Sequence, residues 1–155
     1  MRGNSFALSA LLLLAVCAPE PAAAWVSNAT VARVIDGDTF ETLDGTRFRL
    51  IGMDTPELPS GCFGFEAQAM LEGMIGGRRI SYETGEGANR DQFGRVLAYV
   101  YTGAAPGAGT FVNEFLVERG FARVATFPPN VKHEDDFEAA ELRAQQRPDG
   151  VWRFC

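Results

Sequence analysis

Histidine and lysine are nearly absent from this chain of 155 residues, which contains only His133 and Lys132. A single histidine excludes a metal site built from several imidazoles. The net charge of −6 argues against a basic architectural DNA-binding protein, because such proteins draw their non-specific affinity from an excess of lysine and arginine. Aromatic residues are plentiful, with 12 Phe, 3 Tyr and 2 Trp, so the chain can collapse around a core. Its length fits one domain of roughly 100–200 residues.

Long hydrophobic runs are also missing, except at the start of the chain. Arg2 is followed by an apolar run over Phe6–Val16 and by the small residues Ala22-Ala23-Ala24, the three-part pattern of a secretory signal peptide. The run is too short for a membrane anchor, which needs about 20 apolar residues. We therefore expect residues 1–24 to be removed after Ala24, leaving residues 25–155 as one domain that is secreted or periplasmic, without stable membrane association.

The chain has three cysteines, and export would affect the chemistry of each of them. Lipoprotein processing at Cys17 is an alternative to cleavage after Ala24, but the preceding Val16 is not the small residue usual there. The expected mature chain retains Cys62 and Cys155, which an oxidising compartment would allow to pair. We expect this disulfide, which would hold the end of the chain in place, over the alternative of two unpaired thiols.

The order of the predicted elements favours an α+β fold. Apolar alternation and turn residues predict strands, and apolar residues at helical spacing predict three helices. We expect a small closed antiparallel sheet, such as a five-stranded barrel, with the helices packed on it. The predicted strands are Thr30–Ile35, Thr39–Leu43, Thr46–Met53, Ile80–Glu83 and Val96–Tyr101, with a short extended stretch at Phe121–Ala125, and the predicted helices are Phe65–Ile75, Val112–Arg119 and Glu134–Gln146.

The first hairpin suggests a register. If Asp44-Gly45 is a two-residue turn, Arg49 pairs with Phe40 and Asp38 pairs with Ile51. Asp38 and Arg49 would then lie diagonally on one face of the sheet, about 7–8 Å apart.

Polar residues suited to catalysis cluster in three short segments. Asp38 and Asp54 lie near the ends of two predicted strands that one hairpin joins, so they can approach each other in space. Two converging carboxylates stay ionised most readily around a cation. Oxygen ligands without histidine or cysteine favour Ca²⁺ or Mg²⁺. Glu57 is close enough in sequence to act on a water near the metal, and Arg49 and Arg95 carry guanidinium groups matched to phosphate oxygens. This set of groups is suited to cutting a phosphodiester.

The same segments resemble the staphylococcal nuclease, or thermonuclease, family. That family's pattern is I-D-G-D-T, then R-L-x-x-x-D-T-P-E, then D-x-x-G-R-x-L-A-Y, which here occupies Ile35–Thr39, Arg49–Glu57 and Asp91–Tyr99. The likeness runs from about residue 30 to residue 152, with helices and strands in the family's order. It implies a five-stranded OB-fold barrel with three helices.

The resemblance also implies a reaction, the Ca²⁺-dependent hydrolysis of DNA and RNA. In this reaction the 5′ P–O bond breaks and 3′-phosphate ends remain. Ca²⁺ would be held by the side chains of Asp38 and Asp54 and by the backbone carbonyl of Thr55, while Asp36 would support the loop.

The implied catalytic residues are Glu57, Arg49 and Arg95. Glu57 would act as the general base on the attacking water. Arg49 and Arg95 would bind the scissile phosphate and stabilise the transition state.

Several positions depart from the family pattern. The segment after Glu57 is shorter than the family's loop and lacks lysine, Gln92 replaces a lysine, and Phe93 replaces a tyrosine. The family's base-stacking aromatic pair falls near Thr126 and Phe127, so at most one ring is kept. We expect the chemistry to be retained and the affinity for substrate to be weaker or differently tuned.

Two functions therefore stay open. The first is an exported, monomeric nuclease acting on DNA or RNA, with single strands favoured. The alternative is an exported OB-fold module that binds nucleic acid or another ligand without cutting it. A serine hydrolase is excluded, because no G-x-S-x-G motif occurs.

Overall fold

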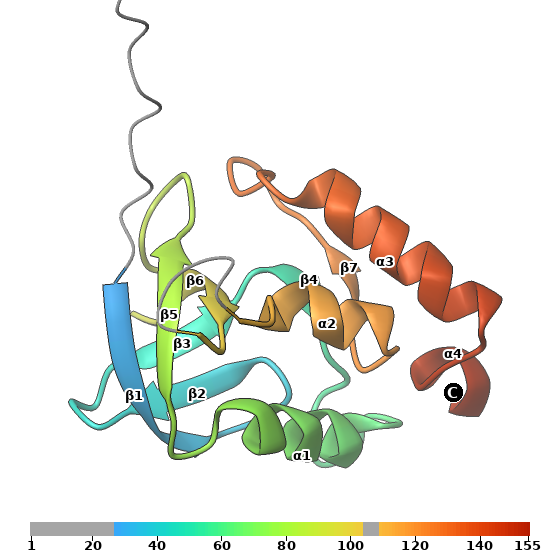
Figure 1. The fold of residues 1–155 in the computed structure, drawn as a ribbon, viewed down its shortest axis with the longest axis horizontal. Helices are drawn as coiled ribbons and strands as arrows, with labels where there is room; N and C mark the ends of the chain where they lie inside the picture. Colours follow the sequence, from blue (N-terminus) through green and yellow to red (C-terminus); the bar gives the residue numbers. More distant parts are fainter. Residues whose placement is uncertain (1–26, 104–108) are drawn as a thin grey trace, which may run out of the picture.

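A closed five-stranded barrel forms the centre of the molecule (Figure 1). The computed structural model describes residues 27–103 and 109–155, so the predicted signal peptide and Cys17 lie outside the described residues. The strands follow one another around the barrel in the order β1-β2-β3-β6-β5, and β1 pairs with β5 to close it. Their bounds are β1 Ser27–Val34, β2 Thr39–Thr42, β3 Arg47–Leu50, β5 Arg79–Thr84 and β6 Val96–Tyr101. The expected five-stranded barrel is confirmed.

The β2–β3 hairpin differs from the predicted register by one residue. Thr42 N donates to Thr46 O over 2.9 Å and Gly45 adopts a φ of 81°, so the loop holds three residues rather than two. Thr39 therefore lies opposite Arg49 and Phe40 lies opposite Phe48. The predicted pairs, Phe40 with Arg49 and Asp38 with Ile51, are wrong, because glycine in the left-handed region adds a residue to the turn.

The sequence predicted an antiparallel barrel, but one pair of strands in the barrel is parallel. Strand β6 runs parallel to β3, with Arg49 beside Leu97. The chain between these strands leaves the barrel, forms a helix, and returns through β5, and such a crossover can bring β6 back in the direction of β3. This pairing places the segment before β6 next to Arg49.

Gly52 ends the run of residues that the sequence predicts as one strand. Its φ of 79° turns the chain out of the barrel, and a Cβ there would lie 2.0 Å from a ring carbon of Phe137. The chain continues as β4 (Gly52–Asp54), which pairs with β7 (Arg123–Ala125) outside the barrel. Asn113, fully buried, holds this corner by donating to Ile51 O over 2.9 Å. Together these contacts set where Asp54 lies.

The helices lie below the barrel and to its right in the view of Figure 1. In the described part of the chain they are α1 Gly64–Ile75, α2 Val112–Glu118, α3 Glu134–Gln146 and the single turn α4 Val151–Phe154. Helix α1 buries Gly64, Ala67, Leu71 and Ile75, which form one stripe at helical spacing. Phe65 and Ala69, although apolar, lie off that stripe and are exposed. Helix α4 was not predicted, since four residues give no periodicity.

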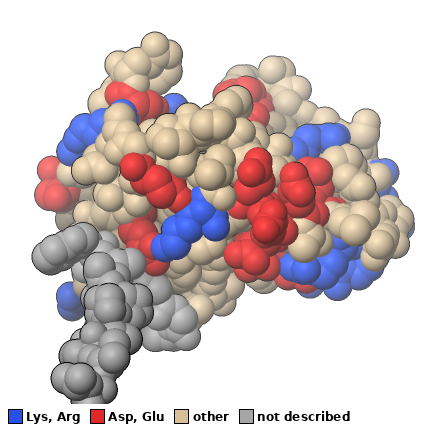
Figure 2. Space-filling model, turned by 90° about the horizontal axis from the view of Figure 1, so that it is seen from above, with Lys and Arg blue, Asp and Glu red and all other residues tan. Residues whose placement is uncertain are grey.

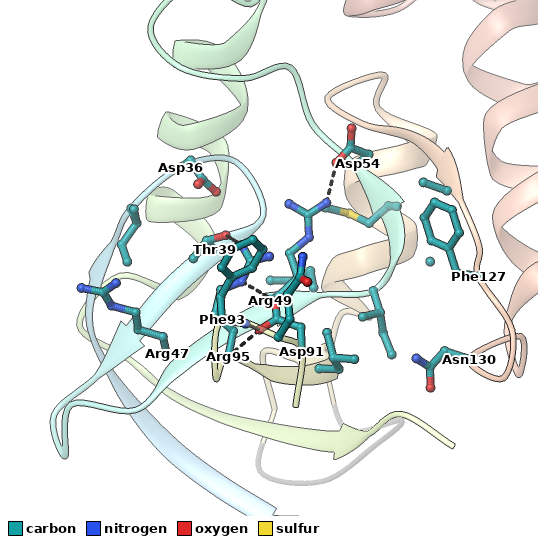
Figure 3. A pocket seen from close by; sticks show the side chains of 18 of the residues that line it. Asp36, Thr39, Arg47, Arg49, Asp54, Asp91, Phe93, Arg95, Phe127 and Asn130 are labelled. Carbon is teal, nitrogen blue, oxygen red and sulfur yellow. Dashed lines mark hydrogen bonds and ion pairs between the residues drawn. The ribbon is translucent and has the colours of Figure 1, made fainter. Parts of the chain in front are cut away.

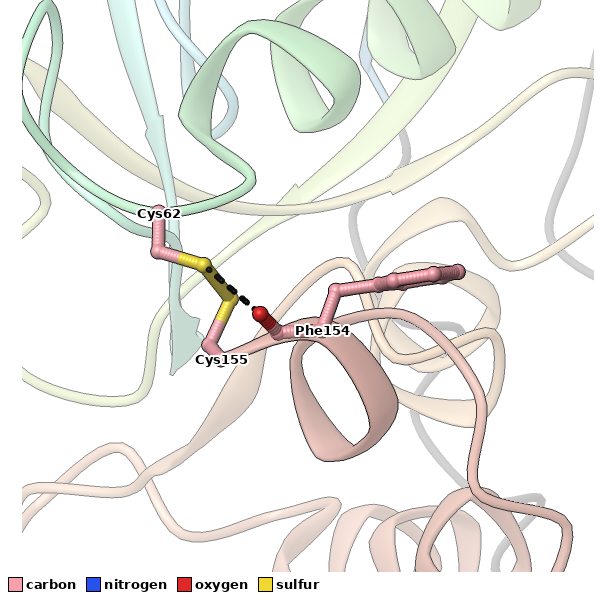
Figure 4. The surroundings of a disulfide bond; sticks show 3 residues. All are labelled: Cys62, Phe154 and Cys155. Atoms are coloured by element: carbon pink, nitrogen blue, oxygen red, sulfur yellow. Dashed lines mark hydrogen bonds between the residues drawn. A yellow bond between two sulfur atoms is a disulfide. The ribbon is translucent and has the colours of Figure 1, made fainter.

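The expected disulfide is present between Cys62 and Cys155, with Cα atoms 5.9 Å apart (Figure 4). It joins the segment before α1 to the end of α4. Across the described residues, none of the helices has the length and hydropathy that crossing a bilayer requires.

Candidate active site

An open cleft of about 850 Å³ lies where β3, β4 and the segment before β6 meet (Figure 3). Four of the sequence-predicted site residues line it, namely Arg49, Asp54, Glu57 and Arg95. The other two, Asp38 and Thr55, are buried, at 2% and 4% exposure. The fold thus brings residues from three distant segments to one place.

Asp38 sits in a cage of hydrogen-bond donors. Its Oδ2 accepts from the amide of Thr55 over 3.2 Å and from the Thr55 hydroxyl over 2.9 Å, and its Oδ1 accepts from the Thr39 hydroxyl over 3.0 Å. Burial raises the pKa of Asp38 to about 6, while the neighbouring Arg49 and the Thr55 hydrogen bonds act to lower it. A buried carboxylate of this kind stays ionised most easily beside a positive charge.

The I-D-G-D-T motif has a structural reason for each polar or small residue. Asp36 Oδ1 accepts from the amide of Asp38 over 3.0 Å, so Asp36 supports the loop, as the sequence suggested. Gly37 packs so closely that a Cβ would lie 2.7 Å from the Thr55 hydroxyl and 2.8 Å from Ala67. Only glycine lets the loop reach Thr55, and this contact brings Asp38 to its partners.

Arg49 spans both predicted metal-binding carboxylates. Its Nη1 pairs with Asp38 Oδ1 and its Nη2 pairs with Asp54 Oδ1. Burial opposes the charged form of Arg49, but the two carboxylates raise its pKa. Asp54 is more than half exposed, whereas Asp38 is almost fully buried. Two carboxylates from different segments therefore converge on one positive charge.

Arg95 is held by a tight loop that explains the D-x-x-G-R motif. Asp91 Oδ1 accepts from the amides of Phe93 and Arg95, each over 2.9 Å, and Asp91 Oδ2 accepts from Arg95 Nε over 2.7 Å. Gly94 adopts a φ of 80° within this turn. Although burial opposes its ionisation, the hydrogen bonds from Arg95 lower the pKa of Asp91. Asp91 thus holds the guanidinium of Arg95 through Nε, and the Nη atoms of Arg95 make no hydrogen bond to Asp91.

Thr39 is a site residue that the sequence reasoning assigned no role. Its hydroxyl donates to Asp38 Oδ1 and accepts from Arg95 Nη1 over 3.3 Å. Its place inside the I-D-G-D-T motif, directly after Asp38, was the available signal.

Glu57 is exposed and lies on the rim of the cleft, in the irregular segment between β4 and α1. That segment folds back on itself, since Gly61 N donates to Glu57 O over 2.6 Å. The structure therefore brings Glu57 to the same cleft as Arg49 and Arg95.

Exposed aromatic rings border the cleft. Phe93 is 74% exposed, Phe127 is 73% exposed, and the Arg95 guanidinium lies 5.5 Å from the centre of the Phe93 ring. Figure 3 shows Phe127 beside Asn130 on the wall opposite Arg47. The hydroxyl of Thr126, by contrast, donates to Glu134 over 2.6 Å and does not line the cleft.

The side chains of this site that could coordinate a metal ion offer oxygen atoms. Within residues 27–103 and 109–155, no group of three His, Cys, Asp or Glu side chains is arranged to hold a metal ion. Asp38 and Asp54 supply two carboxylates around one charge, and further oxygens would have to come from backbone, water or substrate. Such a set suits a hard cation rather than zinc or another soft metal.

Comparison with known proteins agrees with this arrangement. The family model described as staphylococcal nuclease homologue matches residues 47–154. Endonuclease YncB of Bacillus subtilis is 35% identical over 136 residues, covering 81% of this chain and 61% of YncB. The thermonuclease of Staphylococcus hyicus is 34% identical over 130 residues, covering 79% of this chain and 73% of that protein.

Some relatives are considerably longer. The chain spans only 44% of the SPbeta prophage-derived endonuclease YokF of Bacillus subtilis, to which it is 34% identical, and about three-fifths of YncB. The region matched by the family model nevertheless includes Arg49, Asp54, Glu57 and Arg95, and it covers β3, β5 and β6 of the barrel and the helices of the described residues. This chain therefore belongs to the staphylococcal nuclease family.

Proposed function

We propose that this protein is a calcium-dependent nuclease that hydrolyses phosphodiester bonds of DNA or RNA. The observation that carries the proposal is the pairing of Arg49 with both Asp38 and Asp54, in a cleft that also presents Glu57 and Arg95. The names of the related endonucleases and thermonucleases support the same conclusion. We propose that the protein acts as a monomer.

Asp38, Asp54 and the backbone carbonyl of Thr55 would hold Ca²⁺ in this proposal. The two carboxylates already converge on one positive charge, and the amide and hydroxyl of Thr55 fix the orientation of Asp38. When bound, the ion would polarise a phosphoryl oxygen and favour the charge of the transition state.

The arginines would hold the scissile phosphate. A guanidinium is always charged and presents parallel N–H groups that match two phosphate oxygens. Asp91 orients Arg95 through its Nε, so the Nη groups remain directed toward the cleft and Thr39. Arg49 lines the same cleft and would neutralise charge that develops on the phosphoryl oxygens.

Glu57 would take the proton from the attacking water. Its exposed carboxylate lies on the cleft, where it can reach a water molecule beside the bound phosphate. The water oxygen would attack phosphorus, and the 5′ oxygen would leave with the electrons of the broken P–O bond and take up a proton from water. The phosphate would remain on the 3′ end.

Substrate must be attracted by this local group of cations, because the whole chain carries a net charge of −6. Helix α3 begins with Glu134, Asp135 and Asp136, and acidic side chains gather on the face that includes α3 (Figure 2). A polyanion would be repelled from such a face. The exposed rings of Phe93 and Phe127 could stack on unpaired bases, which favours single-stranded substrate.

We also propose that the protein is exported to the periplasm or the medium after removal of residues 1–24. The pattern of the first 24 residues and the Cys62–Cys155 disulfide both support this location.

The test is the cleavage of a short single-stranded DNA labelled at one end, at low salt. With Ca²⁺ we expect products that carry 3′-phosphate, and with a chelator we expect none. A folded protein that cuts nothing at any Ca²⁺ concentration would favour the non-catalytic binding module instead.

A further inference from the structure

The segment that carries Glu57 has no regular secondary structure. Strand β4 ends at Asp54 and helix α1 begins at Gly64, so the intervening residues must be held by other contacts. Glu57 is exposed on this segment. A general base needs a fixed position, because a shift of about 1 Å can cost roughly a hundredfold in rate.

Contacts within the segment tie Glu57 to Cys62. Gly61 N donates to Glu57 O over 2.6 Å, and a Cβ on Gly61 would lie 2.4 Å from the same oxygen. Gly64 N in turn donates to Gly61 O over 3.0 Å. The backbone of Glu57 therefore packs directly against the residue that precedes Cys62.

Cys62 is bonded to Cys155, the residue that directly follows helix α4. The sulfur of Cys62 lies 3.5 Å from Phe154 O (Figure 4). The neighbouring Phe63 adopts a φ of 71°, and its ring stacks on Phe121 at 5.4 Å and on Phe154 at 5.7 Å between centroids. The disulfide and the aromatic stack thus attach the same few residues to the end of the chain.

The end of the chain is itself fixed to the body of the protein. Val151 is 2% exposed, and its amide donates to Gly120 O over 2.9 Å. Gly150 packs so closely that a Cβ would lie 2.1 Å from Gly120 O. A small pocket of about 280 Å³ is lined by both cysteines and by Asp54, Thr55 and Pro56. Without the S–S bond, this pocket leaves the segment room to move.

We propose that the Cys62–Cys155 disulfide is a positioning device for Glu57. Through the Gly61–Glu57 contact, it fixes the Glu57 segment to helix α4 and so holds the carboxylate at the cleft. This inference rests on the proposed function, in which Glu57 is the general base.

The first test compares the protein with the Cys62→Ser/Cys155→Ser double variant, on single-stranded DNA with Ca²⁺, well below the melting temperature of each. We expect kcat to fall about tenfold or more, because a displaced Glu57 no longer acts in the transition state. We expect KM to change less than about threefold, because the arginines that bind the substrate stay in place. Val31→Ala, which truncates a buried residue of β1 and keeps the disulfide, is the control for lost stability and should retain kcat.

A second measurement asks whether the disulfide acts through Glu57. In the Glu57→Gln background, removing both cysteines should change the residual rate less than about twofold, because coupled residues are not additive. Hydrogen exchange should show faster exchange at the Gly61 and Gly64 amides and unchanged exchange in the barrel.

If the double variant does not fold, the folded protein can be reduced instead. A small dithiol supplies two electrons and two protons, the S–S bond breaks to two thiols, and the dithiol closes to its own disulfide. Loss of kcat with native circular dichroism supports the proposal. An unchanged kcat in either form, or equal losses with and without Glu57, overturns it. Absence of cleavage by the unmodified protein would instead overturn the proposed function.

Discussion

Arg95 Nη1 donates a hydrogen bond to the hydroxyl of Thr39 over 3.3 Å. The same hydroxyl donates to Asp38 Oδ1 over 3.0 Å. Thr39 therefore connects an arginine proposed to bind phosphate with a carboxylate proposed to hold Ca²⁺. The connection depends on the parallel pairing of β3 with β6, which brings the start of β6 beside β3, the strand that pairs with β2 on its other edge.

Replacing Thr39 with valine tests this connection. Valine keeps the shape and the strand preference but loses the hydroxyl, so Arg95 and Asp38 lose a shared partner. We expect kcat to fall about tenfold, because one hydrogen bond to a charged group contributes roughly 1.5–3 kcal/mol. Steady-state kinetics measures the change. The matched control is Thr42→Val, whose hydroxyl bonds only Asp44 and Thr46 and lies outside the cleft. Equal losses in both variants would show that the Thr39 hydroxyl has no special role.

Replacing Asp54 with asparagine should weaken Ca²⁺ binding. The substitution removes one of two carboxylates that converge on a single charge, so we expect the affinity for Ca²⁺ to fall about tenfold or more. Isothermal titration calorimetry without substrate gives the affinity directly. Asp135→Asn, an exposed position of α3, is the control and should bind Ca²⁺ as the unmodified protein does. Unaltered affinity in the Asp54 variant would remove Asp54 from the metal site.

Replacing Gln92 with lysine should tighten the binding of nucleic acid. Gln92 lines the cleft next to the Asp91–Arg95 loop, so an added positive charge can contact a phosphate. We expect KM at low salt to fall by about threefold to tenfold, and the salt dependence of log K to steepen by about one unit. Gln145→Lys makes the same change of charge on the exposed surface of α3 and should have little effect. A similar gain in both variants would mean that overall charge, and not the cleft, governs affinity.

Gly52 and Gly45 form a matched pair for testing the fold around the site. Both adopt positive φ, 79° and 81°, but a Cβ at Gly52 would collide with Phe137, whereas at Gly45 nothing lies within 4 Å. We expect Gly45→Ala to cost about 1–2 kcal/mol of unfolding free energy, which is the cost of the left-handed conformation alone. Gly52→Ala should cost about 2–5 kcal/mol, because overpacking adds to that cost. Urea denaturation compares the two, and equal losses would contradict the close packing of Gly52 on Phe137.

Much of this architecture could be predicted from the sequence. The three motif segments, the barrel and three of the helices follow from turn residues, apolar periodicity and the resemblance to a known family. The Asp44-Gly45 turn was found, but its length was not, because a two-residue and a three-residue loop fit the same dipeptide. That ambiguity shifted the register by one residue and placed Phe40, rather than Thr39, opposite Arg49.

The remaining differences depend on contacts between distant segments. The break at Gly52 follows from the position of the Phe137 ring, which belongs to α3 and cannot be read from the local pattern. The parallel partner of β3 depends on how the chain crosses over through α1. Helix α4 is too short for periodicity, and it is held by Gly120 and by the disulfide. The role of the Thr39 hydroxyl could not be predicted either, because it depends on the position of Arg95, which lies on a distant segment.

The most direct test of the proposed chemistry compares the unmodified protein with its Glu57→Gln variant on single-stranded DNA, with saturating Ca²⁺. Glutamine keeps the size of the side chain but cannot accept the proton of the attacking water. We expect kcat to fall about 10²–10⁴-fold while circular dichroism and the melting temperature stay unchanged. Glu66→Gln, an exposed position on α1, is the matched control and should cleave at the unmodified rate. A Glu57→Gln protein that cleaves as fast as the unmodified one would contradict the assignment of Glu57 as the general base.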